Sequence, residues 1–333
     1  MTSNFEVSLE VSIVIPVYNS EQSLGLLLGR LTPVLEPFKR YEIILVNDGS
    51  KDASWHTILR LGREYPQIRG INLMRNYGQH NALLCGIRAA RYETIVTMDD
   101  DLQNPPEEIP KLLDKFSEGY DVVYGTPEKE QHGFWRDLAS QVTKIALQSA
   151  LGAQTARKVS TFRVFRTQLR NAFTNYQSPY VSIDVLLTWG TTNFAAIPVA
   201  HEPRALGASN YTFRKLMTHA LNMITGFSTW PLQAASLIGF AFTFLGFVAL
   251  LYVLGRFLVQ GVVVPGFVFL ASAIAIFSGA QLFALGIMGE YLARMHLRMM
   301  ERPSYSVREE ASVAAPPAAE DAGYYIEHEI GVK

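Results

Sequence analysis

The sequence predicts an α/β domain with a doubly wound, mostly parallel sheet, followed by an amphipathic interface helix and a two-helix transmembrane hairpin. Through residues 1–210, short β-branched apolar runs alternate with helical patterns, which is typical of such a sheet. Farther along, residues 216–255 and 257–289 contain no Asp, Glu, Lys or Arg. Each stretch supplies the roughly 20 apolar residues that cross a bilayer. Two buried helices of a soluble core are the alternative, but such helices rarely stay uncharged for so long.

The first domain divides into predicted strands and helices that alternate along the chain. Strands are expected at 11–17, 41–46, 68–73, 94–98 and 121–124. Helices are expected at 21–31, 53–65, 78–90 and 106–117, the second of them capped by Asp52. Ligands of such sheets bind at the carboxyl ends of the strands. The polar residues that follow each strand therefore mark the expected site.

Composition excludes several classes of protein. Lys and Arg number 29 against 30 Asp and Glu, which is not the basic excess of a nucleic-acid binder. Charged residues make up only 18%, which argues against disorder and against an ordinary soluble enzyme. A lone cysteine, Cys85, excludes a disulfide framework and is expected to be a buried thiol. Neither GxGxxG nor GxxxxGK[ST] occurs, so neither a dinucleotide site nor a P-loop is supported.

The two apolar stretches predict a membrane hairpin with spans near 232–255 and 266–288. Basic residues flank the pair on both sides: Arg204, Arg214 and Lys215 before it, and Arg294, Arg298 and Arg302 after it. The connecting loop holds only Arg256. By the positive-inside rule, the domain formed by residues 1–210 and both termini are expected on the cytoplasmic side of the inner membrane.

Two further segments complete the expected organisation. Residues 211–230 place basic side chains among apolar ones and are expected to form an interfacial amphipathic helix. Residues 293–333 are expected to be a cytoplasmic tail, disordered after Pro303 because Ala, Pro and Glu dominate it.

An acidic cluster follows the fourth predicted strand. Asp99 and Asp101, two residues apart, can reach one divalent cation, and Mg²⁺ or Mn²⁺ suits oxygen ligands that substrate phosphates complete. With Asp100 between them, the three acids repel one another unless positive charge is near. The alternative is that these acids cap the helix beginning at Pro106. Asp48, after the second strand, either accepts a hydrogen bond from a nucleotide base or is an ordinary turn aspartate.

Four segments that follow predicted strands carry a resemblance to a known family: residues 14–19, 46–50, 75–79 and 99–107. They resemble the motifs of family-2 glycosyltransferases of GT-A fold and, within that family, of the polyprenyl-phosphate glycosyltransferases. The segment GEYLAR at 289–294 is similar to the GEYLGR of that group. The resemblance extends to about Tyr305 and implies that residues 1–210 form a GT-A domain.

The resemblance also implies a nucleotide-sugar pocket. Its expected residues are Pro16, Tyr18, Asn19 and Glu21 as lining, Asp48 on the base, Asp99 on the ribose or metal, and Arg75, Gly78 and Gln79 closing the pocket. The expected metal site consists of Asp99, Asp101 and Gln103, which would hold Mg²⁺ or Mn²⁺ on the diphosphate. Arg204 matches an arginine that grips phosphate near the membrane.

Two positions depart from the pattern of the family. Asn210 stands where a lysine is usual, and Thr161 stands where relatives often have an aspartate before Phe-Arg. No catalytic carboxylate can therefore be carried over to position 161, and Asp184 is either a substitute or a helix-capping residue. A polyprenyl phosphate is mostly a dianion at pH 7, so it needs alignment and charge neutralisation more than a general base. The candidates to hold it are Arg163 first, then Arg136 and the pair Arg157 and Lys158, which is equally well a solvated surface pair.

These patterns predict a membrane-anchored transferase with Asp99, Asp101, Arg163 and Arg204 as catalytic residues. It would move a sugar from a nucleotide sugar, expected to be a UDP-sugar, onto a polyprenyl phosphate with inversion, and it resembles proteins that form tetramers. A processive polysaccharide synthase is one alternative, but the QxxRW segment and the additional spans of such enzymes are missing. A non-catalytic membrane scaffold that binds nucleotide sugar is the other.

Overall fold

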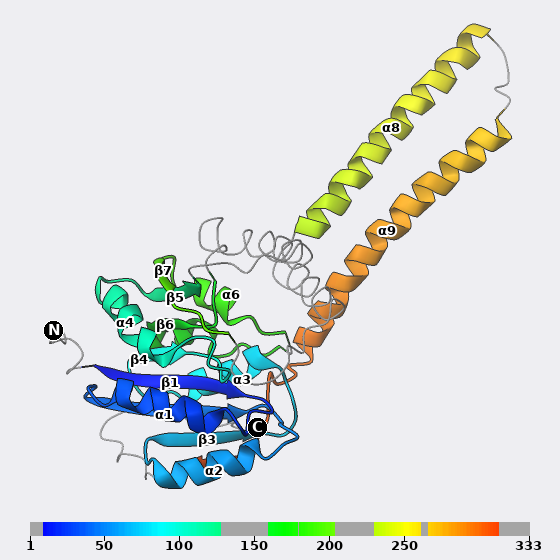
Figure 1. The fold of residues 1–333 in the computed structure, drawn as a ribbon. Helices are drawn as coiled ribbons and strands as arrows, with labels where there is room; N and C mark the ends of the chain where they lie inside the picture. Colours follow the sequence, from blue (N-terminus) through cyan, green and yellow to red (C-terminus); the bar gives the residue numbers. More distant parts are fainter. Residues whose placement is uncertain (1–8, 128–158, 179, 204–229, 261–265, 313–333) are drawn as a thin grey trace, which may run out of the picture.

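The computed structural model describes residues 9–127, 159–178, 180–203, 230–260 and 266–312. They form a sheet domain from which two long helices project side by side (Figure 1). Of the expected amphipathic helix at 211–230, all but Trp230 lies outside the described residues, as do the first eight residues and the chain beyond 312.

The sheet has eight strands in the order β7-β5-β6-β4-β1-β2-β3-β8. The strands are β1 (Glu10–Val17), β2 (Arg40–Asn47), β3 (Ile68–Leu73), β4 (Thr94–Thr97), β5 (Val122–Pro127), β6 (Arg163–Arg166), β7 (Phe194–Val199) and β8 (Val307–Ser312). The ladders from β4 through β1 and β2 to β3 are parallel, as is the β5–β7 ladder. Only β6 and β8 run antiparallel to their neighbours. The prediction of a doubly wound, mostly parallel sheet is confirmed.

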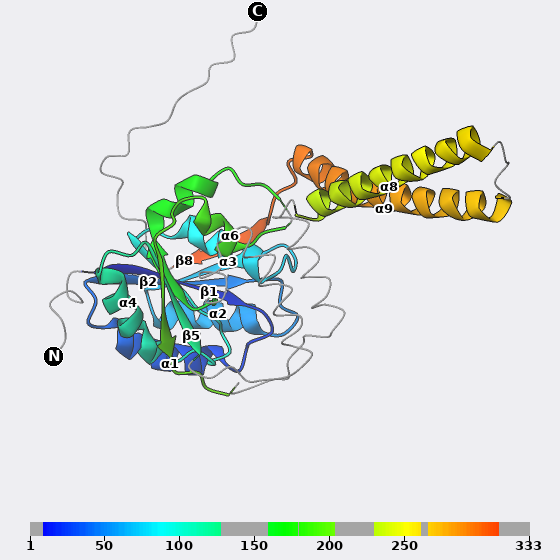
Figure 2. The same cartoon turned by 90° about the horizontal axis from the view of Figure 1, so that it is seen from above.

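Helices cover both faces of this sheet, as Figure 2 shows from above. The first layer contains α1 (Leu24–Leu35), α2 (Ser54–Glu64) and α4 (Ile109–Ser117), with the short η2 (Pro106–Glu108) leading into α4. The second layer contains α3 (Gln79–Ala89), η4 (Thr167–Phe173) and α6 (Ile183–Thr188). Each layer packs on buried Val, Ile and Leu side chains of the strands, so the sheet lies between two apolar cores.

Helix α1 differs from its expected range at both ends. It begins at Leu24 instead of Glu21, because the turn before it bonds to the loop after β2: the Glu21 N–H donates to Asp52 Oδ2 at 3.2 Å. It continues past Pro33 to Leu35, although proline removes one helical hydrogen bond. Leu31 and Leu35 are both fully buried, so apolar packing outweighs that loss.

The two apolar helices are longer than expected. Helix α8 spans Trp230–Gln260 and α9 spans Phe267–Met299, so each is about 45–50 Å long at 1.5 Å per residue. Segments 231–256 and 276–299 are long and apolar enough to cross a membrane by length and composition. The helices pack through a small residue, since a Cβ on Gly246 would lie 3.2 Å from the Phe277 ring. Phe242 adds an edge-to-face contact with the same ring at 5.9 Å.

The expectation of disorder directly after Pro303 is wrong for residues up to 312. β8 pairs antiparallel with β3, and Asn72 Nδ2 donates to Glu309 Oε1 at 2.9 Å. Tyr305 and Val307 pack against the core of the second layer. This segment is ordered because β8 pairs with the backbone of β3 at the edge of the sheet. Its polar composition gave no sign of this pairing.

Candidate active site

The loops after β1 and β2 are joined to each other at the carboxyl edge of the sheet. Asn19 N–H donates to Ser50 Oγ at 3.0 Å, and Asn19 Oδ1 accepts the Lys51 N–H at 2.8 Å. Glu21 Oε2 accepts the Ala53 N–H at 2.8 Å. Two of the predicted pocket residues, Asn19 and Glu21, thus fix the shape of this edge, and Tyr18 beside them is 40% exposed. Pro16, by contrast, is buried within β1 and presents no polar group.

Asp48 holds the next loop in place. Its side chain is buried, and its carboxylate accepts the N–H groups of Tyr77 at 2.7 Å and Gly78 at 2.8 Å. Burial raises the pKa of Asp48, and these two hydrogen bonds oppose that rise. Gly49 has a φ of 64°, and a Cβ there would lie 2.4 Å from the backbone of Arg75. Asp48 is therefore more than a local turn aspartate, and its contact with a nucleotide base stays a prediction.

Asp99 receives hydrogen bonds from two different parts of the fold. Gln79 Nε2, at the first position of α3, donates to Asp99 Oδ1 at 2.6 Å. Thr161 Oγ1, just before β6, donates to Asp99 Oδ2 at 2.6 Å. The Gln79 contact brings together two residues that the sequence assigned to one pocket. The Thr161 contact was not predicted, because nothing in the sequence pairs a lone threonine with an acid 62 residues away.

The central aspartate of the cluster bonds to the loop after β1. Asp100 Oδ2 accepts the Ser20 hydroxyl and the Tyr18 N–H, so it ties the acidic loop to the loop after β1. Burial, together with the nearby charges of Asp99 and Asp101, raises the pKa of Asp100 to about 6. The repulsion expected from three adjacent acids thus persists at Asp100, and the two hydrogen bonds to Asp100 oppose it.

Asp101 begins the short turn that leads to α4. Its Oδ1 accepts the Gln103 N–H at 3.1 Å, and Leu102 between them has a φ of 61°. A left-handed leucine is unusual, and such strain is typical of functional turns. No side chain caps η2, which begins after Pro105, so the alternative that these acids cap that helix is not supported.

The residues at this edge fit a divalent cation that a substrate completes. Asp99 and Asp101 offer carboxylate oxygens, which are the ligands that Mg²⁺ and Mn²⁺ prefer. In the described part of the chain, no group of three or more His, Cys, Asp or Glu side chains could enclose a metal ion. The fit is therefore to a cation held by one or two carboxylates together with diphosphate oxygens, as is usual for Mg²⁺.

Arg163 has a different position from the expected one. It is fully buried, its guanidinium pairs with Asp184, and its Nε donates to Thr97 Oγ1 at 3.1 Å. The Tyr124 hydroxyl also donates to Asp184, at 3.2 Å. A side chain enclosed in this way does not reach a lipid phosphate, so the expected role of Arg163 is corrected to a structural one. Asp184, engaged in the same pair, is neither a free carboxylate nor a helix cap.

The other expected phosphate ligands, Arg136, Arg157, Lys158 and Arg204, lie outside the described residues. A charged cluster that the sequence did not indicate lies around Glu202, two residues before Arg204. Glu202 N–H donates to the Gln103 carbonyl at 2.9 Å. Arg30 donates to Glu202 and to Glu107, with both ion pairs at 2.9 Å. These contacts join the segment before Arg204 to the turn at Gln103 and to Glu107 at the start of η2 and α4.

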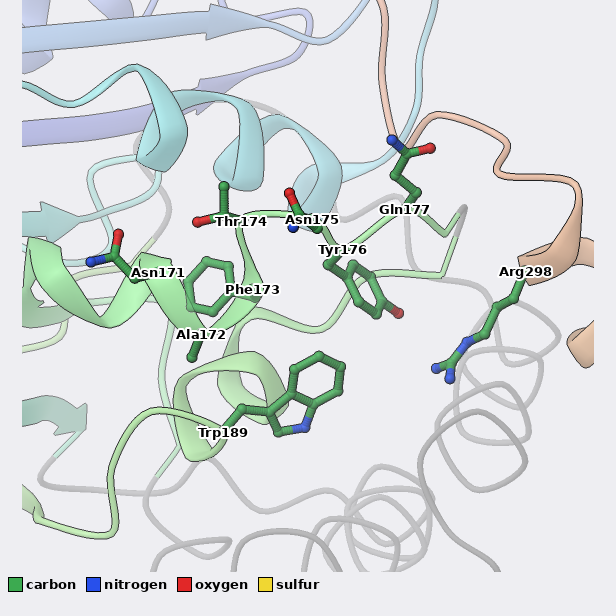
Figure 3. A pocket seen from close by; sticks show the side chains of 9 residues that line it. All are labelled: Asn171, Ala172, Phe173, Thr174, Asn175, Tyr176, Gln177, Trp189 and Arg298. Atoms are coloured by element: carbon green, nitrogen blue, oxygen red, sulfur yellow. The ribbon is translucent and has the colours of Figure 1, made fainter. Parts of the chain in front are cut away.

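A hollow lies where the domain meets α9, and no residue of the acidic loop lines it. It has a volume of about 380 Å³ and is lined by residues 171–177, Trp189 and Arg298. Figure 3 shows Trp189 and Arg298 on either side of Tyr176. Tyr176 meets Trp189 edge to face at 5.5 Å, and Arg298 lies 5.9 Å from the Tyr176 ring centre. None of the residues predicted for the site lines this hollow.

Comparison with known proteins agrees with this arrangement. Residues 12–176 match the family described as Glycosyl transferase family 2. The chain is 35% identical over 310 residues to an undecaprenyl-phosphate 4-deoxy-4-formamido-L-arabinose transferase of Pectobacterium carotovorum, covering 92% of this chain and 95% of that protein. It is 36% identical over 314 residues to the transferase of the same description from Pseudomonas aeruginosa, covering 93% and 92%.

Solved structures show the same fold. Glucosyl-3-phosphoglycerate synthase from Mycobacterium tuberculosis, in complex with Mn²⁺, UDP and phosphoglyceric acid, superposes with a TM-score of 0.51 at 17% identity. The match covers 65% of this chain and 76% of that one. The family match, the relatives and the shared fold show that the chain belongs to glycosyl transferase family 2 and is a glycosyltransferase of GT-A fold.

Proposed function

We propose that this enzyme transfers a sugar from a nucleotide sugar, expected to be a UDP-sugar, to a polyprenyl phosphate at the cytoplasmic face of a membrane. The observation that carries the proposal is that Asp99 and Asp101 lie on one loop at the carboxyl edge of the sheet, beside the loop that Asp48 holds. The relatives that match nine-tenths of the chain are named as undecaprenyl-phosphate transferases, which supports a polyprenyl-phosphate acceptor.

The donor would bind along the joined loops. Asp48 keeps the loop at Arg75–Gly78 in place, and the Arg75 guanidinium lies 4.4 Å from the Tyr77 ring centre. We propose that the base and ribose bind between this loop and Tyr18. A bound Mg²⁺ or Mn²⁺ would neutralise the leaving diphosphate, and the solved relative in complex with Mn²⁺ and UDP is in keeping with a metal. Asp99 and Asp101 would hold it, with Gln103 beside them.

The acceptor would need alignment more than activation. A lipid phosphate that is mostly dianionic at pH 7 is already a nucleophile, and in-line attack on the sugar carbon would invert the anomeric centre. No buried carboxylate of the described residues is needed as a base, which agrees with the engagement of Asp184 by Arg163. Arg136 and the pair Arg157 and Lys158 stay the proposed ligands of the lipid phosphate, and Arg204 stays the proposed ligand of the donor diphosphate.

The apolar hairpin supports a membrane location. We propose that α8 and α9 span the bilayer with both ends cytoplasmic, because basic residues flank the pair on its domain side. The proposed active site would then face the side on which nucleotide sugars are made and the head of the lipid emerges. A tetramer, implied by resemblance alone, stays part of this proposal.

The proposal is tested by product analysis. The full-length protein in detergent is incubated with undecaprenyl phosphate, Mn²⁺ and a panel of radiolabelled nucleotide sugars, with Asp101→Asn as the inactive control. The expected result is a chloroform-soluble labelled lipid that the control does not form. An insoluble polymer would indicate a processive synthase instead, and donor binding without any product would indicate a scaffold.

A further inference from the structure

Thr161 is a half-buried residue just before β6, and its hydroxyl touches the acidic loop directly. Thr161 Oγ1 lies 2.6 Å from Asp99 Oδ2, on the side of the carboxylate opposite to Gln79 Nε2, which lies 2.6 Å from Oδ1. One donor belongs to α3 and the other to the chain entering β6, so the carboxylate is held from two separate elements. We propose that Thr161 is a positioning residue, which orients Asp99 toward a divalent cation on the donor diphosphate.

A hydrogen bond from β4 fixes the backbone of Thr161. The Thr97 hydroxyl donates to the Thr161 carbonyl at 2.6 Å and accepts Arg163 Nε at 3.1 Å. Arg163 is fully buried against Asp184, and its β6 pairing places it opposite Thr97. An unbroken series of contacts therefore runs from a buried ion pair, through two threonines, to Asp99. This series explains why a buried guanidinium lies behind the site without reaching it.

The Thr161 hydroxyl orients Asp99 better than a carboxylate at position 161 would. Each oxygen of an ionised carboxylate has room for more than one partner, so an oxygen that accepts a hydrogen bond can still bind a metal ion. A donor on each oxygen fixes the plane of the Asp99 carboxylate, whereas a carboxylate at position 161 would repel it. Residues that orient a metal ligand in this way typically change metal affinity about 10–100-fold when they are removed.

This inference rests on the proposed function, because it assumes that Asp99 binds the cation with the donor. The test is therefore a binding measurement that needs no acceptor lipid and no turnover. Free Mn²⁺ is followed by electron paramagnetic resonance as the full-length protein is titrated in detergent with saturating UDP. Thr161→Ser keeps the hydroxyl and Thr161→Ala removes it, while both lose the methyl group.

A matched control lies on the other side of the same strand. Thr167 is the first residue of η4, directly after β6, and its buried hydroxyl donates to the Tyr92 carbonyl, so Thr167→Ser and Thr167→Ala make the same chemical changes beside β6 without removing a contact to Asp99. We expect Thr161→Ala to raise the apparent Kd for Mn²⁺ about 10–100-fold. The apparent Kd of Thr161→Ser for Mn²⁺ should lie within about 3-fold of that of the wild type, and both Thr167 variants should bind Mn²⁺ as tightly as the wild type does.

The outcomes separate this inference from the proposed function. If the wild type binds Mn²⁺ with UDP and Thr161→Ala binds it equally well, the role of Thr161 is refuted and the proposed function stands. If both Thr161 variants weaken binding alike, the methyl group and not the hydroxyl matters, which also refutes it. If the wild type binds no Mn²⁺ in the presence of UDP, the metal role of Asp99 fails and the inference fails with it.

Discussion

Replacing Asp184 by alanine would leave the Arg163 guanidinium buried without its carboxylate. Arg163 is fully buried and Asp184 is 6% exposed, so water cannot replace the lost partner. Breaking a buried ion pair from one side typically costs about 3–5 kcal/mol. For a domain of this size, each kcal/mol lowers the melting temperature by about 2–4 °C, so we expect a decrease of roughly 6–20 °C.

Thermal unfolding of the full-length protein in detergent measures this effect. A double variant, Arg163→Met with Asp184→Leu, removes both charges and is expected to recover most of the loss, because apolar side chains often replace a buried pair without penalty. Arg166→Met is the control on the same strand. Arg166 pairs with Asp121 at 3.0 Å, but both side chains are partly exposed, so its loss should cost no more than about 1 kcal/mol.

Two results would refute the reasoning. If Asp184→Ala lowers the melting temperature no more than Arg166→Met does, Arg163 is not an enclosed charge that depends on Asp184. If the decrease in melting temperature of the double variant equals the sum of the decreases of Arg163→Met and Asp184→Leu measured separately, the two side chains are not coupled. Either result would reopen the expectation that Arg163 faces the acceptor.

Further predictions concern the metal, the membrane and pH. Asp101→Asn should abolish transfer without changing the melting temperature by more than a few degrees, and EDTA should stop the wild type until Mg²⁺ or Mn²⁺ is added; full activity in EDTA would exclude the metal. Burial raises the pKa of the Cys85 thiol to about 12, so iodoacetamide should label it only after unfolding. In a Cys85→Ser background, an impermeant thiol reagent outside intact cells should label a cysteine at Val263 and not one at Met300; the reverse pattern would overturn the orientation. Asp100 binds its proton more tightly in the folded state, so it lowers stability as pH rises from about 4 to about 6. Asp100→Asn should flatten that part of the melting-temperature profile, and an unchanged profile would show that Asp100 does not titrate there.

Much of the parallel sheet could be predicted because each strand ends at its own polar turn. The apolar runs before Asn47 and before Asp99 each predict a strand. The polar residues that follow each run mark the carboxyl edge of the sheet, where ligands are expected to bind. β6 and β8 give no comparable signal. β6 is only four residues long and contains two arginines, and β8 is half charged. Both are ordered by backbone pairing with strands that lie far away in the sequence.

In the candidate site too, some residues could be assigned from the sequence and others could not. The motifs assigned residues such as Asp48 and Gly78 to one pocket, and the structure brings these two residues into contact. The supporting contacts were not predicted. From the sequence, Arg163 was the first candidate to hold the lipid phosphate, because nothing in its short strand indicates that Asp184, 21 residues later, pairs with it in the interior. Thr161 looked like the loss of an acid, whereas the fold gives its hydroxyl a contact with Asp99.

The chain that returns from α9 connects the hairpin to the site over a short distance. Helix α9 ends at Met299, and eight residues later β8 begins its pairing with β3. Met74, at the end of β3, donates its N–H to the Ser306 carbonyl at 2.9 Å, and its own carbonyl accepts Arg308 Nη2 at 3.1 Å. The next residue is Arg75, which opens the loop that Asp48 holds. The β3–β8 ladder therefore ties the start of the proposed nucleotide loop to the segment that returns from the apolar hairpin. In the proposed function, this connection would hold the site for the sugar donor near the helices that would meet the lipid acceptor.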